Sequence, residues 1–175
     1  MSTLASTRRG FLLSAALLPL AACATGPAKV GPVKPARTVT VGIVGLNDFH
    51  GALEPPRTSV IMSDGQGGVI QLPAGGAAYL ASAIDQVRGQ YSHSLAISAG
   101  DMIGATQLSS SLFLDEPAVE VMNRLGLDFN AVGNHEFDRG RDELKRKQNG
   151  GCAQHTALKP CRLEPFRGAK FGYLA

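Results

Sequence analysis

The sequence has little charge and lacks an apolar run long enough to cross a bilayer. Asp, Glu, Lys and Arg make up only 18% of its 175 residues, and the formal net charge is +3. Removal of an N-terminal leader that contains Arg8 and Arg9 would lower this charge by two, to +1, because no acidic residue precedes position 23. So small a positive charge does not indicate a nucleic-acid-binding surface.

The rest of the composition is typical of a globular protein with many tight loops. Apolar residues account for 44% of the chain, and 21 residues are glycine. This profile differs from that of a disordered chain, which has too little apolar surface to form a core. A chain of 175 residues is long enough for one domain with a hydrophobic core and barely long enough for two.

The N-terminus has the features of an export signal. Paired Arg8 and Arg9 precede an apolar run over 11–22. This run falls short of the roughly 20 residues that span a bilayer, so residues 1–22 are predicted to be a signal peptide. The Arg-Arg-Gly-Phe-Leu segment resembles a twin-arginine signal.

The same leader ends in Leu20-Ala21-Ala22-Cys23, which looks like a bacterial lipobox. Acylation of Cys23 would hold an exported protein at a membrane surface, in the periplasm or cell envelope. Simple cleavage, with Cys23 incidental, is the alternative. Residues 23–37 contain three prolines and two glycines and are predicted to be an extended linker.

From residue 38 onward, strand-like and helix-like segments alternate. This order predicts an α/β fold with mainly parallel strands and flanking helices. The first strand, which lacks clean alternation, is expected to be buried on both faces. The expected elements are a strand at 38–46, a surface excursion at 54–74, a helix at 75–90, a strand at 95–98, a helix at 116–125, a strand at 129–132 and a helix at 138–148.

Polar side chains follow each of the three strands. The segments are Asn-Asp-Phe-His-Gly at 47–51, Ala-Gly-Asp at 99–101 and Gly-Asn-His-Glu-Phe-Asp at 133–138. In a parallel sheet, ligands bind beyond the carboxyl ends of the strands. The three segments are therefore expected to converge on one site.

The side-chain types indicate a two-metal hydrolytic site. Asp48 and His50 would point to the same side of an extended loop and bind one transition metal. Asp101 follows a glycine, and its carboxylate can bridge two ions. Asn134 offers a neutral oxygen for the second ion. Two ions about 3.5–4 Å apart can clamp a phosphoryl oxygen and activate water.

His135 and Asp138 are expected to act without binding metal. His135 would face the substrate, and Asp138 would orient its ring and favour the imidazolium form. Glu136 is interpreted as a structural carboxylate, while His93 and His155 are expected at the surface.

These segments, in this order, resemble the metallophosphoesterase signature. The fuller pattern over residues 41–140, which adds Gly-Gly-Ala-Ala-Tyr-Leu at 75–80, resembles the bacterial 5′-nucleotidase and UDP-sugar hydrolase family of the calcineurin-like superfamily. The resemblance implies a layered α/β domain, two divalent metal ions and a nucleotide or nucleotide-sugar substrate. It also implies that Asp48 and His50 bind one metal, that Asp101 bridges, that Asn134 binds the second, and that His135 stabilises the transition state or protonates the leaving group with Asp138 as its partner.

The chain departs from this family downstream of residue 140. The family completes its metal site with a further histidine and a His-x-His stretch, whereas only His93 and His155 remain here, and neither lies in such a pattern. Residues 38–175 are therefore expected to be the N-terminal part of a truncated metallophosphoesterase domain with little activity alone. The alternative to an enzyme is an exported, non-catalytic lipoprotein fragment that binds metal or nucleotide weakly. The His, Asp and Asn ligands suit manganese, zinc, cobalt or iron.

Two further features of the sequence carry predictions of their own. Cys152 and Cys161 are predicted to form a disulfide in an exported protein, with a zinc site as the alternative. A basic run is predicted to be a solvated helix face, with phosphate attraction as the alternative; it comprises Arg139, Arg141, Lys145, Arg146 and Lys147.

Overall fold

The computed structural model describes residues 37–57 and 59–175. The predicted signal peptide at 1–22, the lipobox Cys23 and all of the linker except Arg37 lie outside this range. None of the helices in the described part of the chain combines the length and the apolar character that a membrane crossing requires.

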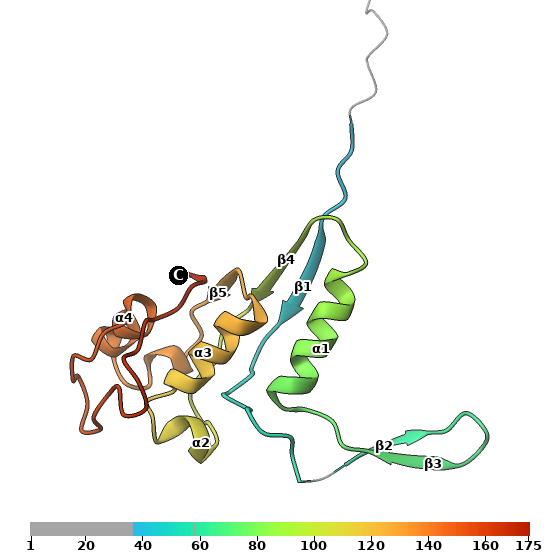
Figure 1. Cartoon of the computed structure of the whole chain (residues 1–175), viewed down its shortest axis with the longest axis horizontal. Helices are drawn as coiled ribbons and strands as arrows, with labels where there is room; N and C mark the ends of the chain where they lie inside the picture. The colour runs from blue at the N-terminus through green and yellow to red at the C-terminus, as the bar shows by residue number, and fades with distance from the viewer. Residues whose placement is uncertain (1–36, 58) are drawn as a thin grey trace, which may run out of the picture. The chain divides into compact units, whose positions relative to one another are not determined.

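Four parallel strands form the main sheet (Figure 1). They are β1 (Gly42–Leu46), β4 (Ser94–Ser98), β5 (Phe129–Ala131) and β6 (Gly172–Leu174), in the spatial order β1-β4-β5-β6. Every neighbouring pair is parallel. The structure thus confirms the predicted α/β class, a parallel sheet with flanking helices.

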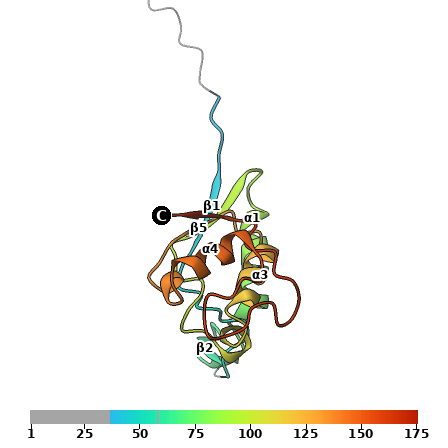
Figure 2. The same cartoon turned by 90° about the vertical axis from the view of Figure 1, so that its left-hand side faces the viewer.

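Helices connect these strands, and the longest of them packs against the first two strands of the sheet. They are α1 (Gly76–Arg88), the short α2 (Leu108–Ser111), α3 (Glu116–Leu125), the 3₁₀ turn η1 (His135–Phe137) and α4 (Arg141–Asn149). The crossovers from β1 to β4, β5 and β6 all advance in the same direction across the sheet. Because crossovers between parallel strands are right-handed with few exceptions, this order places the connecting helices against the same face (Figures 1 and 2).

The bounds of α3 agree with the sequence prediction because its end signals are strong. Pro117 lies in the first turn, where its missing N–H costs no hydrogen bond. Gly126 closes the helix in the left-handed region, at φ 69°. The predicted helix at 138–148 begins later: residues 135–137 form η1, and Gly140, at φ 83°, separates this turn from α4.

The hydrophobic core lies between the helices and one face of the sheet. Ile84 of α1, Ala96 of β4 and Met122 of α3 are all at most 3% exposed. On the opposite face, Ile43 is 65% exposed and Leu95 is 38% exposed. The prediction that the first strand is buried on both faces is therefore wrong for the described residues, because all of their sheet-covering helices pack on one side.

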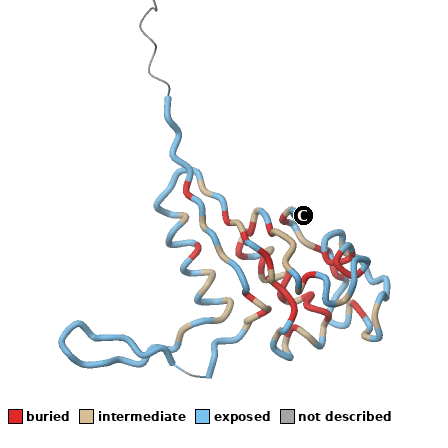
Figure 3. Tube along the Cα trace, turned by 180° about the vertical axis from the view of Figure 1, so that it is seen from behind, coloured by how far each residue is buried: buried red, intermediate tan, exposed pale blue. Residues whose placement is uncertain are grey.

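An antiparallel hairpin, β2 (Val60–Ser63) and β3 (Val69–Leu72), lies within the segment that was predicted as a surface excursion. Its turn is held by Asp64, whose Oδ1 accepts hydrogen bonds from the N–H groups of Gln66 and Gly68. All eight strand residues are exposed, and Figure 3 shows the hairpin as a uniformly exposed arm. The location at the surface agrees with the prediction, although the strands themselves were not foreseen.

Candidate metal centre and acid–base pair

The three polar segments meet at the carboxyl edge of the parallel sheet, as the strand order requires. The loops after β1 and β4 are joined by backbone hydrogen bonds from Asp48 N to Gly100 O at 3.1 Å and from His50 N to Asp101 O at 3.0 Å. A third bond, from Gly51 N to Met102 O, continues the pairing at 3.0 Å. The parallel pairing of the strands therefore extends into the loops and fixes where their side chains point.

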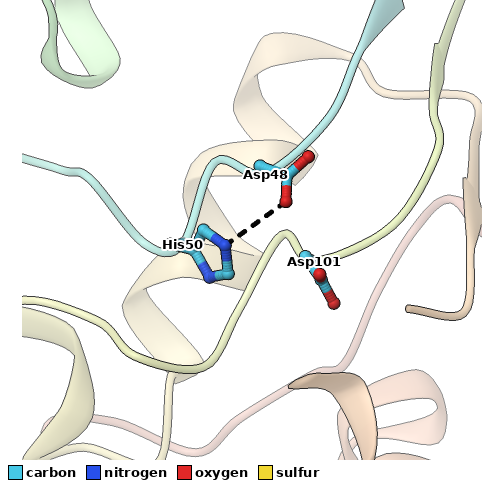
Figure 4. Close-up of side chains that lie close together, drawn as sticks. All are labelled: Asp48, His50 and Asp101. Carbon is cyan, nitrogen blue, oxygen red and sulfur yellow. Dashed lines mark ion pairs between the residues drawn. The ribbon is translucent and has the colours of Figure 1, made fainter. Parts of the chain in front are cut away.

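Asp48, His50 and Asp101 form a group suited to a cation. Each offers one ligand atom, and these atoms lie within 4.8 Å of one another. Asp48 Oδ1 is 3.5 Å from His50 Nε2, and Figure 4 shows both side chains directed toward the loop that bears Asp101. Two carboxylates and an imidazole suit a first-row transition metal.

These three residues also share an unusual backbone conformation. Their φ angles are 51°, 46° and 54°, in the left-handed region that non-glycine residues rarely adopt. Such conformations cost about 1–3 kcal/mol each and cluster at functional sites, where the surrounding structure holds them. The strain coincides with the cation-binding group, which supports a functional rather than an incidental cluster.

His50 presents one ring nitrogen to the group and uses the other as an anchor. Its Nδ1 lies 3.0 Å from the carbonyl oxygen of Gly104. A hydrogen on Nδ1 donates to this carbonyl, which leaves the Nε2 lone pair facing Asp48. This arrangement is usual for metal-binding histidines, because the second hydrogen bond fixes the tautomer and the ring orientation.

Glu136 links the loop after β4 to the loop after β5. Its side chain is fully buried, and its Oε2 accepts the N–H groups of Asp101 at 2.9 Å and Gly133 at 2.8 Å. Its Oε1 accepts the N–H of Met102 at 2.9 Å and a hydrogen of Asn130 Nδ2 at 3.1 Å. Four donors on one carboxylate compensate its burial, in agreement with the structural role predicted for it.

His135 and Asp138 form a hydrogen-bonded pair beside the cation-binding group. His135 Nδ1 is 2.7 Å from Asp138 Oδ2, within η1 and the residue that follows it. The His135 ring meets the His50 ring edge to face, with centroids 4.9 Å apart. The hydrogen bond to Asp138 raises the pKa of His135 above its usual value, and the negative charges of Asp138, Asp101 and Glu136 act in the same sense.

Similar proteins point to one family. No protein-family model matches the chain. An uncharacterised protein from Acinetobacter calcoaceticus is 50% identical over 139 residues, which cover 78% of this chain and 68% of the relative. A Bacillus subtilis endonuclease is 40% identical over 67% of this chain and 9% of its own length, and a probable 5′-nucleotidase of Treponema pallidum is 36% identical over 75% and 24%.

A solved structure supports the same family. The NAD nucleotidase of Haemophilus influenzae aligns with a TM-score of 0.50 and 28% identity, over 67% of this chain and 22% of that protein. This chain belongs to the 5′-nucleotidase family of metallophosphoesterases. The family is one of enzymes. The chain spans less than a quarter of the length of the nucleotidases it matches.

Asn134, which the family resemblance assigns to the second metal, lies at the edge of the site. The residue is exposed and sits between Gly133 and His135, both of which contact Asp101. The N–H of His135 donates to Asp101 Oδ1 at 3.0 Å, and a Cβ at position 133 would lie only 2.2 Å from that oxygen. Because residue 133 is a glycine, the loop after β5 can approach Asp101 closely.

The structure corrects the interpretation of the basic run. Arg139 is one-quarter exposed, and Arg141 and Lys145 are exposed, but Arg146 and Lys147 are only 4% and 1% exposed. Arg146 is buried because its guanidinium binds Glu143 at 2.7 Å and Glu116 at 2.8 Å. The prediction of a fully solvated helix face is therefore wrong. A run of basic residues in the sequence does not show which of them meet acidic partners in the folded chain.

Cys152 and Cys161 are joined by a disulfide, with an S–S distance of 2.04 Å. The bridge lies next to the buried ion pairs: Cys161 N donates to Glu116 Oε1 at 3.0 Å, and Arg146 donates to Gly151 O at 2.9 Å. His93 and His155, the remaining histidines, are exposed. Neither belongs to the cation-binding group formed by the described residues.

Proposed function

We propose that this chain provides the site of a metal-dependent phosphoric ester hydrolase that acts on nucleotides or nucleotide-sugars. The observation that supports this most directly is the convergence of Asp48, His50 and Asp101, all three in strained conformations, beside the His135–Asp138 pair. A metal-binding group next to a hydrogen-bonded histidine can catalyse phosphoric ester hydrolysis, because the metal activates water and the histidine can transfer a proton.

The residues present fit a divalent metal. Asp48, His50 and Asp101 would hold one ion, with Asp101 shared and Asn134 contributing to a second. Two such ions, drawn from manganese, zinc, cobalt or iron, would activate water and neutralise charge on the phosphoryl group when bound. The chain's own contribution is a set of ligands held in place by Glu136, by the backbone bonds between loops and by the Gly104 carbonyl.

His135 is proposed to interact with the oxygen of the leaving group. Its Nδ1 is engaged by Asp138, which leaves Nε2 as the ring atom available to a substrate. Because Asp138 favours the protonated ring, Nε2–H would stabilise the negative charge of the transition state or deliver its proton to the leaving oxygen. Asp138 is a positioning residue in this scheme, since it acts through the imidazole.

Hydrolysis by the purified chain tests the proposal. Release of phosphate from a nucleoside 5′-monophosphate is measured with added manganese, and metal binding is measured separately by calorimetry. Asp101→Asn is expected to weaken metal binding and hydrolysis at least about tenfold, whereas Asp85→Asn, an exposed residue of α1, should change neither. Metal binding without hydrolysis would instead favour the non-catalytic alternative, a fragment that binds metal or nucleotide weakly.

Export and membrane attachment are also proposed, on the strength of the leader sequence. The paired Arg8 and Arg9 and the lipobox ending at Cys23 support a lipid-anchored protein of the periplasm or cell envelope. Mass spectrometry of the mature N-terminus in a membrane fraction decides this. A mature N-terminus without a lipid would contradict it. So would a protein that keeps Cys23 and is recovered in the soluble fraction.

A further inference from the structure

A cavity opens beside His135, next to the cation-binding group. Its volume is about 320 Å³, which falls in the range of small-ligand sites. The lining residues that matter here are Thr106, Asp115, His135, Asp138, Arg139 and Lys147. Two of these, Arg139 and Lys147, are basic side chains that the proposed hydrolytic mechanism does not use.

Lys147 is the residue that most needs an explanation. It belongs to α4 and is only 1% exposed, yet it lines the cavity. Within the described part of the chain, its ammonium group has no carboxylate within 4.0 Å and makes no hydrogen bond. Lysine is almost never buried unless it is paired. Burial lowers the pKa of Lys147, as expected for a cation that lacks a close partner.

The nearby acids are already engaged by other donors. Asp115 Oδ1 accepts hydrogen bonds from Thr106 Oγ1 at 2.7 Å and Ser110 Oγ at 3.1 Å, and Asp115 Oδ2 lies 3.7 Å from Arg139 Nε. Asp138 is bound to His135. Asp115 and Glu143 attract the Lys147 ammonium group without forming an ion pair with it, while Arg139 and Arg146 repel it. The cavity therefore combines two basic side chains with two acids that each already accept a hydrogen bond.

We propose that this cavity is an oxyanion site, with Lys147 at its base and Arg139 at its rim. The ligand chemistry is a tetrahedral phosphate, either orthophosphate or a phosphate group of a nucleotide. Arg139 can contribute donors because its present contacts are long: 3.7 Å to Asp115 and 3.3 Å to the Ser111 carbonyl. A role in holding a substrate phosphate rests on the proposed hydrolase function, whereas orthophosphate binding does not.

Binding to the full chain in excess EDTA tests the site without any contribution from metal. Calorimetric titrations use orthophosphate, a nucleoside 5′-monophosphate and the corresponding nucleoside. Orthophosphate and the nucleotide are expected to bind, and the nucleoside is not. Tighter binding of the nucleotide than of orthophosphate would assign the site to substrate, and the reverse order to free phosphate.

Lys147→Met should reduce orthophosphate affinity at least about tenfold, whereas Lys145→Met, an exposed lysine of the same helix, should leave it unchanged. Circular dichroism checks that each variant is folded. If Lys147→Met does not fold, Arg139→Gln decides, because it also removes a cation from the cavity. Phosphate affinity that is unaffected by either folded variant, or absent from the wild type, overturns the proposal. Metal-dependent hydrolysis without phosphate binding in EDTA would reject this site alone and leave the hydrolase function standing.

Discussion

The Oε2 atom of Glu136 accepts the backbone N–H of Asp101 at 2.9 Å, so a fully buried carboxylate fixes the loop that bears a candidate metal ligand. The same side chain also binds Gly133 and Met102. Glu136 thus couples the loops after β4 and β5, and the position of Asp101 depends on it.

Glu136→Gln is expected to destabilise the chain by about 3 kcal/mol. An amide has one acceptor oxygen, so its NH₂ group would face N–H donors that now bind a carboxylate oxygen. Urea unfolding measures the loss, and calorimetry should show weaker manganese binding as Asp101 shifts. Glu164→Gln, at an exposed position, is the control. Equal stability of the two variants would show that Glu136 does not hold the loops.

Asp138→Asn is expected to lower the pKa of His135. The hydrogen bond to the Asp138 carboxylate is the largest cause of the raised value, and an amide provides neither its charge nor an equivalent acceptor. Proton NMR of the imidazole in metal-free protein follows this titration directly. The wild-type ring stays protonated to higher pH than the variant ring. Asp142→Asn, at an exposed position of α4, should leave the His135 titration where it is.

The sequence alone predicted much of the fold because its local signals agree with one another. Pro117 and Gly126 mark both ends of α3, and the bounds match the structure. The alternation of strands and helices predicted the parallel order, and this order brings Asp48, His50 and Asp101 together. Positions at strand ends are predictable because topology, rather than side-chain packing, determines them.

Other features depend on contacts between distant residues and could not be predicted in this way. Arg146 is buried because Glu116, 30 residues earlier, meets it inside the fold. Lys147 lies next to it in the sequence and is buried, yet residues 37–57 and 59–175 supply no such partner. The pattern of charges in the sequence predicts the burial of neither residue. The hairpin β2–β3 was also missed, because its strands are exposed on all sides and therefore lack the alternation that marks a half-buried strand.

Tyr173→Phe should protect the chain at high pH. Burial raises the pKa of the Tyr173 hydroxyl, and within the described residues this buried oxygen has no hydrogen-bond partner. Since the folded-state pKa exceeds the unfolded value of about 10, the wild type loses stability as pH rises above about 10. The variant avoids this part of the loss and should be equally or more stable at pH 7.

Urea unfolding at pH 7 and at about pH 11 measures both effects. Tyr79→Phe, which alters a tyrosine that is 47% exposed, serves as the control. An identical alkaline loss in wild type and Tyr173→Phe would show that the hydroxyl ionises without unfolding.

Replacement of Cys152 and Cys161 by serine is expected to reduce the free energy of unfolding by about 2–3 kcal/mol. The bridge closes a short loop, with a sequence separation of 9, and the loop-closure entropy of the unfolded chain accounts for this amount. The loss of stability should be larger than the loop-closure entropy alone if the substitution also weakens the hydrogen bond from Cys161 N to Glu116. Glu116 forms an ion pair with the buried Arg146, so this pair would be weakened as well. Unfolding of the double variant is compared with that of oxidised and reduced wild type. Alkylation without reductant provides the direct check: if both thiols are modified in the folded wild type, the bridge is absent and the stability argument fails with it.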